Sequence, residues 1–532
     1  MMSDQEATTC LALHSEEEPP ADIGMEQGDA KPEVEGAKSL TASTLVPVTE
    51  LDATPNTEKQ EIELNDPAVL EWMVQTDKTS ENENHNDLLW RDWEDLYELD
   101  STSKELFDFT ILSYNILSQD LVEQNPTLYT HCSPIILGWD YRWQSILQEL
   151  QHWDADVLCL QEVQEDHYRE QVQPSLSALG YSCHYKRRTG RKTDGCCTCF
   201  KLSRFTLLHE RHVEYFRPGI QVLNRDNIGL VLLLSPILKE GLEKSPHALC
   251  VANTHLLFNP RRGDIKLAQL ALLLAEVDKI SQTSDGAHHP ILLCGDLNAT
   301  PGSPLYRFIR NGILNYKNLP AWKVSGQEKF CPTLHPWILS APLWPDALGI
   351  SDHCQFAVNL RKTDRLVYTR EQILHLRFCE CALQRPPELC LIVGVTDRQP
   401  DPDTETVHIA PPMIFANSQT PVFRSLPILQ HNLLLTSVYS HFLVAKGRPE
   451  VTTIPLGIGS TVDYIFYSAE PLVEDNTSHG VRFYQDSKLK LLGRLCLLSE
   501  NDLWPAHGLP NQFYCSDHLC LLARFALDIS VP

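Results

Sequence analysis

The pattern of hydrophobic positions changes near Phe107. Before it apolar residues are sparse, and after it they fall into short runs that end in polar residues. Two segments, 139–153 and 265–280, instead carry apolar residues at the spacing of a helix face. The runs predict strands at Phe109–Leu117, Val157–Val163, Ile228–Leu234, Leu249–Leu256, Ile291–Leu297, Val462–Tyr467 and Leu519–Phe525.

The order of these elements indicates the fold class. Strands and helices alternate at first and strands dominate later, which predicts an α/β body with buried sheets. Between about residues 361 and 431 the pattern weakens and Pro, Asp and Thr become frequent. We expect an insertion or long loops there, within a domain spanning residues 107–530.

The segment before the body is acidic. The chain of 532 residues has 44 Lys+Arg and 70 Asp+Glu, a formal net charge of −26. Residues 1–100 hold 26 of the acidic residues and five of the basic ones. Residues 1–85 cannot bury enough apolar surface to offset chain entropy, so we expect a disordered acidic extension. The charge excludes a generic polycationic coat for nucleic acid, although local basic patches remain.

An aromatic segment, residues 86–106, joins the extension to the body. Within Leu88–Leu99, Trp90, Trp93 and Tyr97 have helix-like spacing. Such a stripe either binds a partner or docks onto the chain's own domain, and we favour docking.

Targeting signals and cysteines bear on location. No apolar run approaches the roughly 20 residues needed to span a bilayer, and Asp4, Glu6 and Glu16 precede any basic residue, unlike a signal peptide. We read the 17 cysteines as reduced thiols. Cys196, Cys197 and Cys199 lack a second pair at zinc-finger spacing, which favours strand cysteines over zinc. A cytoplasmic protein is expected, with peripheral attachment to endomembranes or a perinuclear position left open.

Several predicted strands end in polar residues of an unusual kind. Each alone is most often a turn or cap residue, but such ends converge on one rim of an α/β sheet, where ligands bind. Period-two spacing places Asp296 with Asn298, and Asn253 with His255, on shared strand faces. The ends are Ser113–Asn115, Gln161–Glu162, Asn253–His255, Gly295–Asn298, Val462–Tyr464 and Ser516–His518.

This combination of residues indicates phosphoester chemistry. Carboxylates with an amide oxygen suit Mg²⁺, a hard cation that prefers oxygen ligands. Histidines beside such a metal suit a phosphoryl group, and an Asp followed two residues later by Asn can orient water for in-line attack. No GxSxG elbow or HExxH pair competes. The residues therefore predict metal-assisted phosphoester hydrolysis.

The motifs in series resemble the exonuclease–endonuclease–phosphatase superfamily, in its branch of deadenylase-like RNA phosphoesterases. This resemblance implies two packed β-sheets flanked by helices. WDYRW at Trp139–Trp143 and RPEVTT at Arg448–Thr453 are similar to the Angel branch. The series runs SYN, LQEV, KTDGC, DN, NTHL, GDLN, DYIFYS and SDHLCL, beginning at Ser113, Leu160, Lys192, Asp226, Asn253, Gly295, Asp463 and Ser516.

The resemblance also implies metal and water roles. Glu162 would be the principal Mg²⁺ ligand, and Asn115 would help to bind metal and phosphate. Asp296 would activate or orient the attacking water, and Asn298 would position the water or the scissile phosphate. Asp517 would support His518 or the metal.

The same resemblance assigns the remaining polar residues. His255 would stabilise charge on phosphorus, with Asp463 holding its imidazole in the useful tautomer. His518 would contact the scissile phosphate. Asp226 and Asn227 resemble the substrate-side DN element, and Asn253 and Arg188 complete the expected substrate-binding set. Ser351–His353 repeats the SDH tripeptide but precedes Asp463 in the chain, so we interpret it as incidental.

Three further features concern RNA. The run Lys186–Lys192 packs five cations into seven residues and either grips an RNA backbone or forms a solvated hairpin loop. Phe216, Phe258 and Trp322 are candidate stacking platforms, and none is assigned. Poly(A)-trimming relatives have an aromatic residue shortly before the Asp of the DY motif, and Leu456–Val462 contains none.

One segment resembles a partner motif. Tyr368, Ile373 and Leu374 fit a Tyr-x4-aliphatic-aliphatic helix of the kind that docks on the cap-binding initiation factor 4E. The pattern is short, so chance or packing against the domain remains the alternative.

Together these observations predict a Mg²⁺-dependent phosphoesterase acting on RNA 3′ ends. The Angel resemblance favours hydrolysis of a terminal 2′,3′-cyclic phosphate. The alternatives are a 3′→5′ exoribonuclease of deadenylase type and a translation-linked adaptor that binds initiation factor 4E.

Overall fold

The computed structural model describes residues 91–97, 106–238, 247–329, 337–356, 426–454, 458–472 and 484–530. The expected acidic extension over residues 1–85, most of the expected insertion, and Tyr368, Ile373 and Leu374 lie outside these ranges. In the described part of the chain, no helix is long and apolar enough to cross a membrane.

The described body is built on two seven-stranded sheets. The first has the order β1 (Trp93–Asp95), β17 (Leu489–Leu495), β18 (Leu521–Asp528), β2 (Leu106–Asn115), β3 (Val157–Gln164), β5 (Asp194–Lys201) and β4 (Tyr181–Arg187). The second has the order β12 (Leu435–Ser437), β15 (Asp463–Pro471), β9 (Ile291–Asp296), β8 (Leu249–His255), β7 (Ile228–Pro236) and β6 (Phe205–Glu214), with β16 (Tyr484–Asp486) paired to β15.

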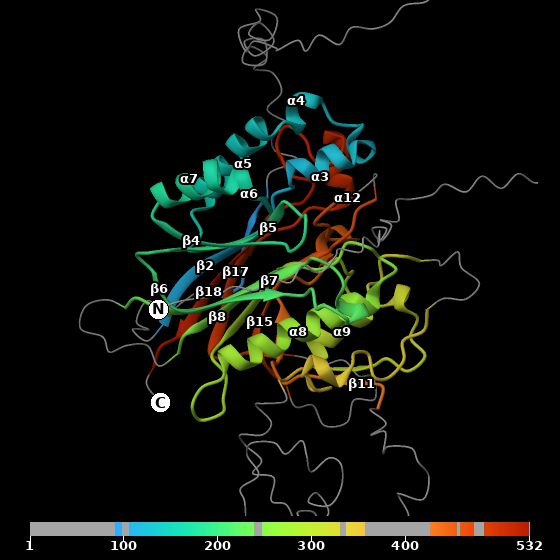
Figure 1. Ribbon diagram of the computed structural model, residues 1–532. Helices are drawn as coiled ribbons and strands as arrows, with labels where there is room; N and C mark the ends of the chain where they lie inside the picture. Colours follow the sequence, from blue (N-terminus) through green and yellow to red (C-terminus); the bar gives the residue numbers. More distant parts are fainter. Residues whose placement is uncertain are drawn as a thin grey trace, which may run out of the picture. The chain divides into compact units, whose positions relative to one another are not determined.

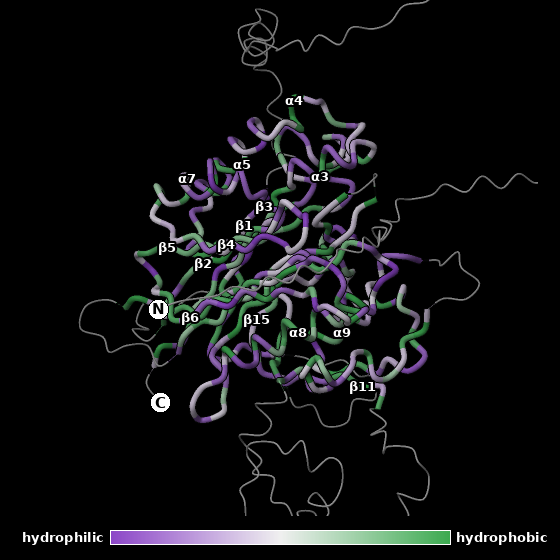
Figure 2. The backbone as a smooth tube through the Cα atoms, in the orientation of Figure 1, coloured by the Kyte–Doolittle hydropathy of each residue, from purple (hydrophilic) through white to green (hydrophobic). Residues whose placement is uncertain are grey.

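The two sheets pack face to face. Phe109 and Ile111 from β2 share one buried cluster with Leu230 and Leu232 from β7 and with Leu292 from β9. Because alternate residues of a strand point to opposite faces, the other positions of the same strands face the helices. In Figure 2 hydrophobic positions follow most of these strands.

Helices cover both outer faces (Figure 1). The helices α5 (Trp139–Trp153) and α7 (Gln173–Ala178) pack on the first sheet, where Ile146 and Leu150 contact its outer residues. The helices α8 (Gly263–Ser281) and α9 (Pro304–Asn311) pack on the second sheet. The prediction of an α/β body of two packed sheets flanked by helices is confirmed.

The remaining elements are short. They include the helices α3 (Gln119–Gln124), α4 (Pro134–Leu137), α6 (Glu165–His167) and α12 (Glu500–Leu503), and the paired strands β10 (Ile313–Asn315) with β11 (Ile428–Gln430) and β13 (Phe442–Leu443) with β14 (Arg448–Pro449).

The described part of the aromatic segment, residues 91–97, contains a short strand where its spacing indicated a helix. Trp93–Asp95 forms β1, which pairs antiparallel with β17. The guanidinium of Arg91 is buried and donates to the carbonyls of Cys520 (2.7 Å) and Cys496 (2.9 Å). The helix prediction was wrong because β17 offers unpaired backbone groups at a sheet edge, and pairing with them outweighs a local helical preference.

Candidate active site

The strand register brings the polar strand ends to one end of both sheets. Within the second sheet, Asp296 of β9 is paired with His255 of β8 on one side and with Asp463 of β15 on the other. Within the first sheet, Asn115 of β2 is paired with Gln161 of β3, next to Glu162. The packed sheets therefore place these side chains opposite one another.

The Asn115 amide joins the two sheets. Its Nδ2 donates to Glu162 Oε1 (3.0 Å) and to Asp296 Oδ2 (3.3 Å), so it lies between carboxylates from opposite sheets. Ser516 fixes the end of β2 by donating its hydroxyl to the Asn115 carbonyl (2.6 Å). The predicted neighbourhood of Asn115, Glu162 and Asp296 is thus present.

Glu162 owes its orientation to an irregularity in β3. The β3–β5 register shifts between Leu160 and Val163, and Glu162 has a φ of +55°. A left-handed conformation is uncommon for a residue with a side chain and costs free energy, which the surrounding sheet must offset. The bulge aims the carboxylate at Asn115 and at the backbone N–H of Ser118, which donates to Oε2 (3.1 Å).

Asp296 and Asn298 are positioned by a tight strand end. Gly295 has a φ of +132°, and a Cβ there would lie 1.9 Å from the Thr254 carbonyl oxygen, so only glycine fits before Asp296. The backbone N–H of Asn298 donates to Asp296 Oδ1 (2.9 Å), and Asn298 itself has a φ of +48°. The turn brings both side chains to the same site.

Asp463 contacts His518, and the expected pairing with His255 was wrong. Asp463 Oδ2 lies 2.7 Å from His518 Nδ1. His255 and Asp463 lie on strands that flank β9 from opposite sides, so two strand spacings separate them, roughly 10 Å. Burial lowers the pKa of His518, but the carboxylates of Asp463 and Asp517 outweigh it and hold that pKa well above its usual value.

His255 is held by Asn298. Asn298 Nδ2 lies 3.1 Å from His255 Nε2, and Asp296 Oδ2 lies 3.5 Å from the same nitrogen. His255 Nδ1 is buried and has no hydrogen-bond partner among the described residues. Burial lowers the pKa of His255, so the neutral ring is favoured. The site therefore pairs one neutral with one protonated histidine.

Asp517 faces the same cluster from the loop before β18. Tyr129 donates its hydroxyl to Asp517 Oδ2 (2.9 Å), whereas Asp517 Oδ1 is buried and has no hydrogen-bond partner within the described ranges. Burial raises the pKa of Glu162 to about 7, with further repulsion from Asp517 and Asp194. Burial and the charge of Asp463 likewise raise the pKa of Asp296.

This electrostatic strain suits a divalent cation. Several buried carboxylates share the site with few cations, and an added positive charge would relieve their repulsion. Asp296, Asp463 and His518 present ligand atoms within 4.8 Å of one another. A second donor set comprises Glu162, Asn115 and Asp517, with the unpartnered Asp517 oxygen available. The second set offers oxygen ligands alone and fits a hard cation, whereas the protonated imidazole of His518 in the first set has no lone pair to offer.

The expected substrate residues line one side of the site. Arg188 donates to Asp194 through Nε (3.0 Å), and both act electrostatically on His255. Asp226 accepts a hydrogen bond from the Thr189 hydroxyl (2.5 Å). Asn227 is buried, donates to the backbone carbonyl of His255 (3.2 Å) and accepts from Gln269 (3.2 Å). Arg188, Asp226 and Asn227 are thus near the catalytic cluster.

Asn253 does not line the side of the site where the other expected substrate residues lie. It is fully buried, its Nδ2 donates to the carbonyls of Leu160 (3.1 Å) and Cys197 (3.0 Å), and its Oδ1 accepts from Gln161 (2.9 Å). Its hydrogen-bonding groups are consumed in joining the two sheets. The position supports a structural role, in place of the substrate contact that we expected.

The repeated tripeptide Ser351–His353 lies elsewhere. The Asp352 carbonyl accepts from the Gln430 backbone of β11 (2.8 Å), and neighbouring Gln355 donates to Asp278 of α8 (3.2 Å). Chain order distinguished it correctly from Ser516–His518, whose members do reach the cluster.

Sequence reasoning missed Lys266. It is fully buried in α8 and donates through Nζ to the carbonyl of Asn298 (2.7 Å) and to Gln327 Oε1 (2.7 Å). Burial lowers its pKa to about 7. A lysine within an apolar helical pattern was the available signal, since lysine is almost never fully buried without partners. Tyr129 was also missed, and nothing in its sequence context distinguishes it. Asp194 stands in the KTDGC motif quoted above, but no role was assigned to it.

Comparisons with known proteins identify chains that this one resembles. Protein angel homolog 1 of Rattus norvegicus is 56% identical over 461 residues, which cover 84% of this chain and 68% of that protein. Protein angel homolog 2 of Homo sapiens is 48% identical over 80% of this chain and 71% of its own length.

A solved structure is also similar. The crystal structure of ANGEL2, a 2′,3′-cyclic phosphatase, in complex with adenosine-2′,3′-vanadate, matches with a TM-score of 0.62 and 45% identity, covering 83% of this chain and 99% of that chain. The model of the Endonuclease/Exonuclease/phosphatase family matches residues 112–518, which span the strand ends described above. The chain therefore belongs to the Endonuclease/Exonuclease/phosphatase family.

Proposed function

We propose that this protein is a Mg²⁺-dependent phosphoesterase that hydrolyses the terminal 2′,3′-cyclic phosphate of RNA. The observation that carries the proposal is the convergence of Asn115, Glu162, Asp296 and His518 from both sheets on one buried site. Similarity to ANGEL2, a 2′,3′-cyclic phosphatase, supports the choice of substrate.

Glu162 and Asn115, with Asp517, are the residues that we assign to the metal. Asp463 and His518 already satisfy each other at 2.7 Å, so a cation between them would have to break a charge-assisted hydrogen bond. Glu162 has no cationic partner within hydrogen-bonding distance among the described residues. When bound, Mg²⁺ would neutralise charge on the phosphoryl oxygens and lower the pKa of water.

Asp296 orients the attacking water and accepts its proton. Its raised pKa brings the carboxylate closer to the basicity that proton transfer at neutral pH requires. Asn298, tied to Asp296 through its backbone N–H, positions the water or the phosphate. Water then forms a bond to phosphorus while a bond from phosphorus to a ribose oxygen breaks.

The two histidines act on the phosphoryl group in different protonation states. His518, kept protonated by Asp463, donates through Nε2 to a phosphoryl oxygen or to the leaving ribose oxygen. His255 is neutral, and with Asn298 donating to Nε2 its proton lies on the otherwise unpartnered Nδ1. Charge that develops on the phosphoryl oxygens thus meets two donors.

Arg188, Asp226 and Asn227 form the side of the site that we assign to the terminal nucleotide. Asp226 offers a carboxylate, and Arg188 offers a positive charge partly neutralised by Asp194. Asn227 is buried with its amide bonded to the His255 carbonyl and to Gln269, so it supports this side from within. This combination suits a ribose and base better than a run of phosphates.

The rival activity is 3′→5′ exoribonuclease cleavage of the deadenylase type. It would use the same residues, because the two reactions differ in how the terminal nucleotides are held. Ile458–Val462, just before Asp463, contains no aromatic residue on which an adenine could stack, and this favours the cyclic phosphatase.

The test uses the full chain with Mg²⁺ and two RNA oligonucleotides. One ends in a 2′,3′-cyclic phosphate and the other in oligo(A) with a free hydroxyl. Loss of the cyclic phosphate without shortening supports the proposal. A ladder of shortened oligo(A) supports the exoribonuclease, and no change in either substrate contradicts both.

We further propose that Tyr368, Ile373 and Leu374 bind initiation factor 4E and that the protein acts in the cytoplasm. The Tyr-x4-Ile-Leu spacing supports the first proposal, and the absence of disulfides among the described cysteines supports the second. A pull-down with purified factor 4E should lose the complex on Tyr368→Ala. Retention of the complex would contradict the binding motif.

A further inference from the structure

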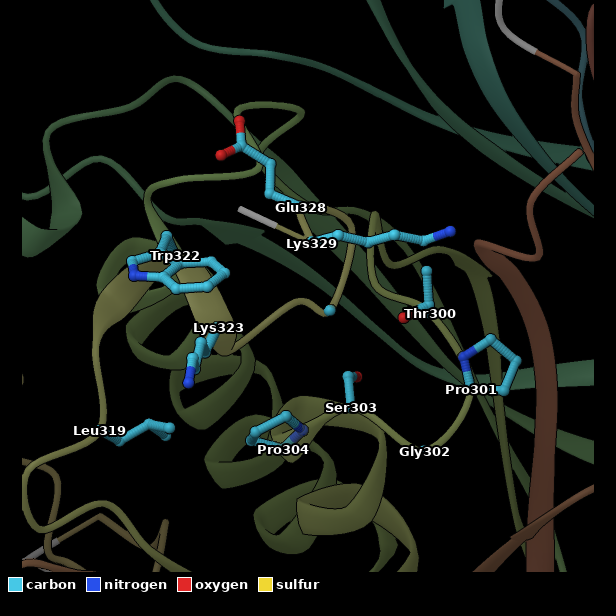
Figure 3. A pocket seen from close by; sticks show the side chains of 11 residues that line it. Thr300, Pro301, Gly302, Ser303, Pro304, Leu319, Trp322, Lys323, Glu328 and Lys329 are labelled. Carbon is cyan, nitrogen blue, oxygen red and sulfur yellow. The ribbon is translucent and has the colours of Figure 1, made fainter. Parts of the chain in front are cut away.

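A cavity of about 420 Å³ lies beside the catalytic turn. Thr300, Pro301 and Ser303 form one wall, and Trp322 and Lys329 stand across from them (Figure 3). One residue, Ala299, separates Asn298 from Thr300, so their Cα atoms lie at most about 7 Å apart. The cavity is therefore adjacent to the reacting phosphate in our assignment, at a separation of the order of one nucleotide.

The cavity wall is fixed to the catalytic turn. Lys266 donates to the Asn298 carbonyl and to the side chain of Gln327, which lies between two lining residues, Gly326 and Glu328. The Thr300 backbone N–H donates to the Ser325 carbonyl (2.8 Å). The cavity and the catalytic turn thus form one hydrogen-bonded unit.

The lining combines an aromatic ring with positive charge. Trp322 is half-buried, with the Lys323 ammonium 5.2 Å from its ring centre. Lys329 is exposed, and its side chain extends towards Thr300 in Figure 3. Among the described residues, neither lysine forms a salt bridge, whereas Glu328 is neutralised by Arg261 (2.9 Å). The local charge is therefore positive.

Aromatic residues and one arginine continue beyond the cavity. Trp337 and Phe258 are 62% and 67% exposed. The Arg262 guanidinium, which also pairs with Asp264 (2.7 Å), lies 5.7 Å from the Trp337 ring centre. Trp337 adjoins the cavity because its carbonyl accepts from the backbone N–H of Ala321 (2.8 Å). Exposed rings interspersed with cations are the composition of a surface that binds single-stranded nucleic acid.

The basic run Lys186–Lys192, which includes Arg188 on the other side of the site, is less available to bind RNA phosphates. Lys186 pairs with Glu214, Arg187 with Glu165 and Arg188 with Asp194. Three of its five cations are thus matched by carboxylates of the chain itself. Lys323 and Lys329 are the better candidates to meet a phosphate.

We propose that this cavity binds the nucleotide preceding the 3′-terminal nucleotide of RNA, with its base against Trp322 and its phosphate at Lys329. The inference rests on the proposed function for its placement of the terminal phosphate. It assigns recognition of the RNA body to the α8–α9 side of the site, where stacking tolerates any base and specificity for sequence is not required.

The test measures RNA binding, so that it does not depend on turnover. Fluorescence anisotropy would follow a 5′-fluorescein 2′-O-methyl RNA tetramer, which resists cleavage, titrated with the full chain in Mg²⁺. Trp322→Ala and Lys329→Glu should each raise the Kd about tenfold, as expected for loss of one stacking or phosphate contact. The tenfold loss on Lys329→Glu should shrink at high salt.

Two variants control for charge and for folding. Lys488→Glu makes the same charge change on an exposed residue in the turn between β16 and β17, at the opposite end of the sheets from the site, and should change the Kd less than twofold. Trp322→Phe keeps a ring of smaller area and should restore most of the affinity, with a thermal melt to verify folding.

The outcomes separate this inference from the proposed function. A folded Trp322→Ala protein with wild-type affinity overturns the inference, as does equal weakening by Lys488→Glu and Lys329→Glu. If the cyclic phosphate is not hydrolysed but the binding pattern holds, the proposed function fails and the cavity still binds RNA.

Discussion

Asp463 Oδ2 lies 2.7 Å from His518 Nδ1, and this contact keeps the imidazole charged. The two residues come from different sheets, β15 in one and the loop before β18 in the other. The pair therefore connects the sheets at the point where we place the phosphoryl group. His255 lies in the same site but favours the neutral ring, because burial lowers its pKa.

We predict that Asp463→Asn lowers kcat/KM by at least about 100-fold, because His518 loses the charge that keeps it protonated. The pKa of His518 should fall, so the remaining activity should decline at a lower pH on the alkaline side of its pH–rate profile. Steady-state kinetics across pH would measure both effects. Asp352→Asn in the repeated tripeptide is the matched control, and an equal loss there would contradict the assignment.

Replacing Glu162 tests the metal assignment. We expect Glu162→Gln to lower turnover by orders of magnitude while the fold stays intact, since the amide keeps the shape but loses the charge that holds Mg²⁺. Differential scanning fluorimetry should show that Mg²⁺ stabilises the wild type and no longer stabilises the variant. Glu165→Gln, three residues away and partly exposed, should behave as the wild type. Full activity of Glu162→Gln would remove Glu162 from the site.

The affinity for Mg²⁺ should depend on pH near neutrality. In the metal-free protein burial raises the pKa of Glu162 to about 7, so this carboxyl is largely protonated at pH 6 and ionised at pH 8. A cation must displace that proton, so affinity should rise from pH 6 to pH 8 with release of a proton. Isothermal titration calorimetry in buffers of different ionisation enthalpy would detect it. An affinity that is constant over this range would show that Glu162 is already ionised.

Asn253 should prove structural. Asn253→Ala removes the hydrogen bonds that Gln161 and two backbone carbonyls make to the Asn253 amide, and we expect it to lower the free energy of unfolding by about 1–3 kcal/mol. The KM for RNA should stay near the wild-type value at temperatures where the variant is folded. Chemical denaturation and steady-state kinetics would separate the two. A raised KM with unchanged stability would restore the substrate role.

Most of the fold followed from local patterns. Helix α5 begins and ends at the predicted residues, Trp139 and Trp153, because its apolar stripe is complete within the segment. Strand β1 could not be predicted from local patterns, because its partner β17 is about 400 residues away and no residue near Trp93 indicates that pairing. Local spacing alone indicated a helix there, and tertiary pairing overrode it.

The site shows the same division. Which residues belong to the site could be predicted, because polar residues at the ends of buried strands are conspicuous in sequence. Which of these residues contact one another could not be predicted, because whether Asp463 contacts His518 or His255 depends on the order of strands across the sheet. Lys266 was overlooked because its partners, the Asn298 carbonyl and Gln327, become neighbours only when α8 packs beside the catalytic turn.

The most direct test of the central claim follows oxygen from water into the product. A single-turnover reaction of the full chain with Mg²⁺ and an RNA ending in a 2′,3′-cyclic phosphate would be run in H₂¹⁸O and analysed by mass spectrometry. The account predicts RNA of unchanged nucleotide length that has lost its cyclic phosphate, with ¹⁸O in the phosphate group that was cyclic. Release of a terminal nucleotide, with ¹⁸O at the next phosphate and the cyclic group intact, would contradict it.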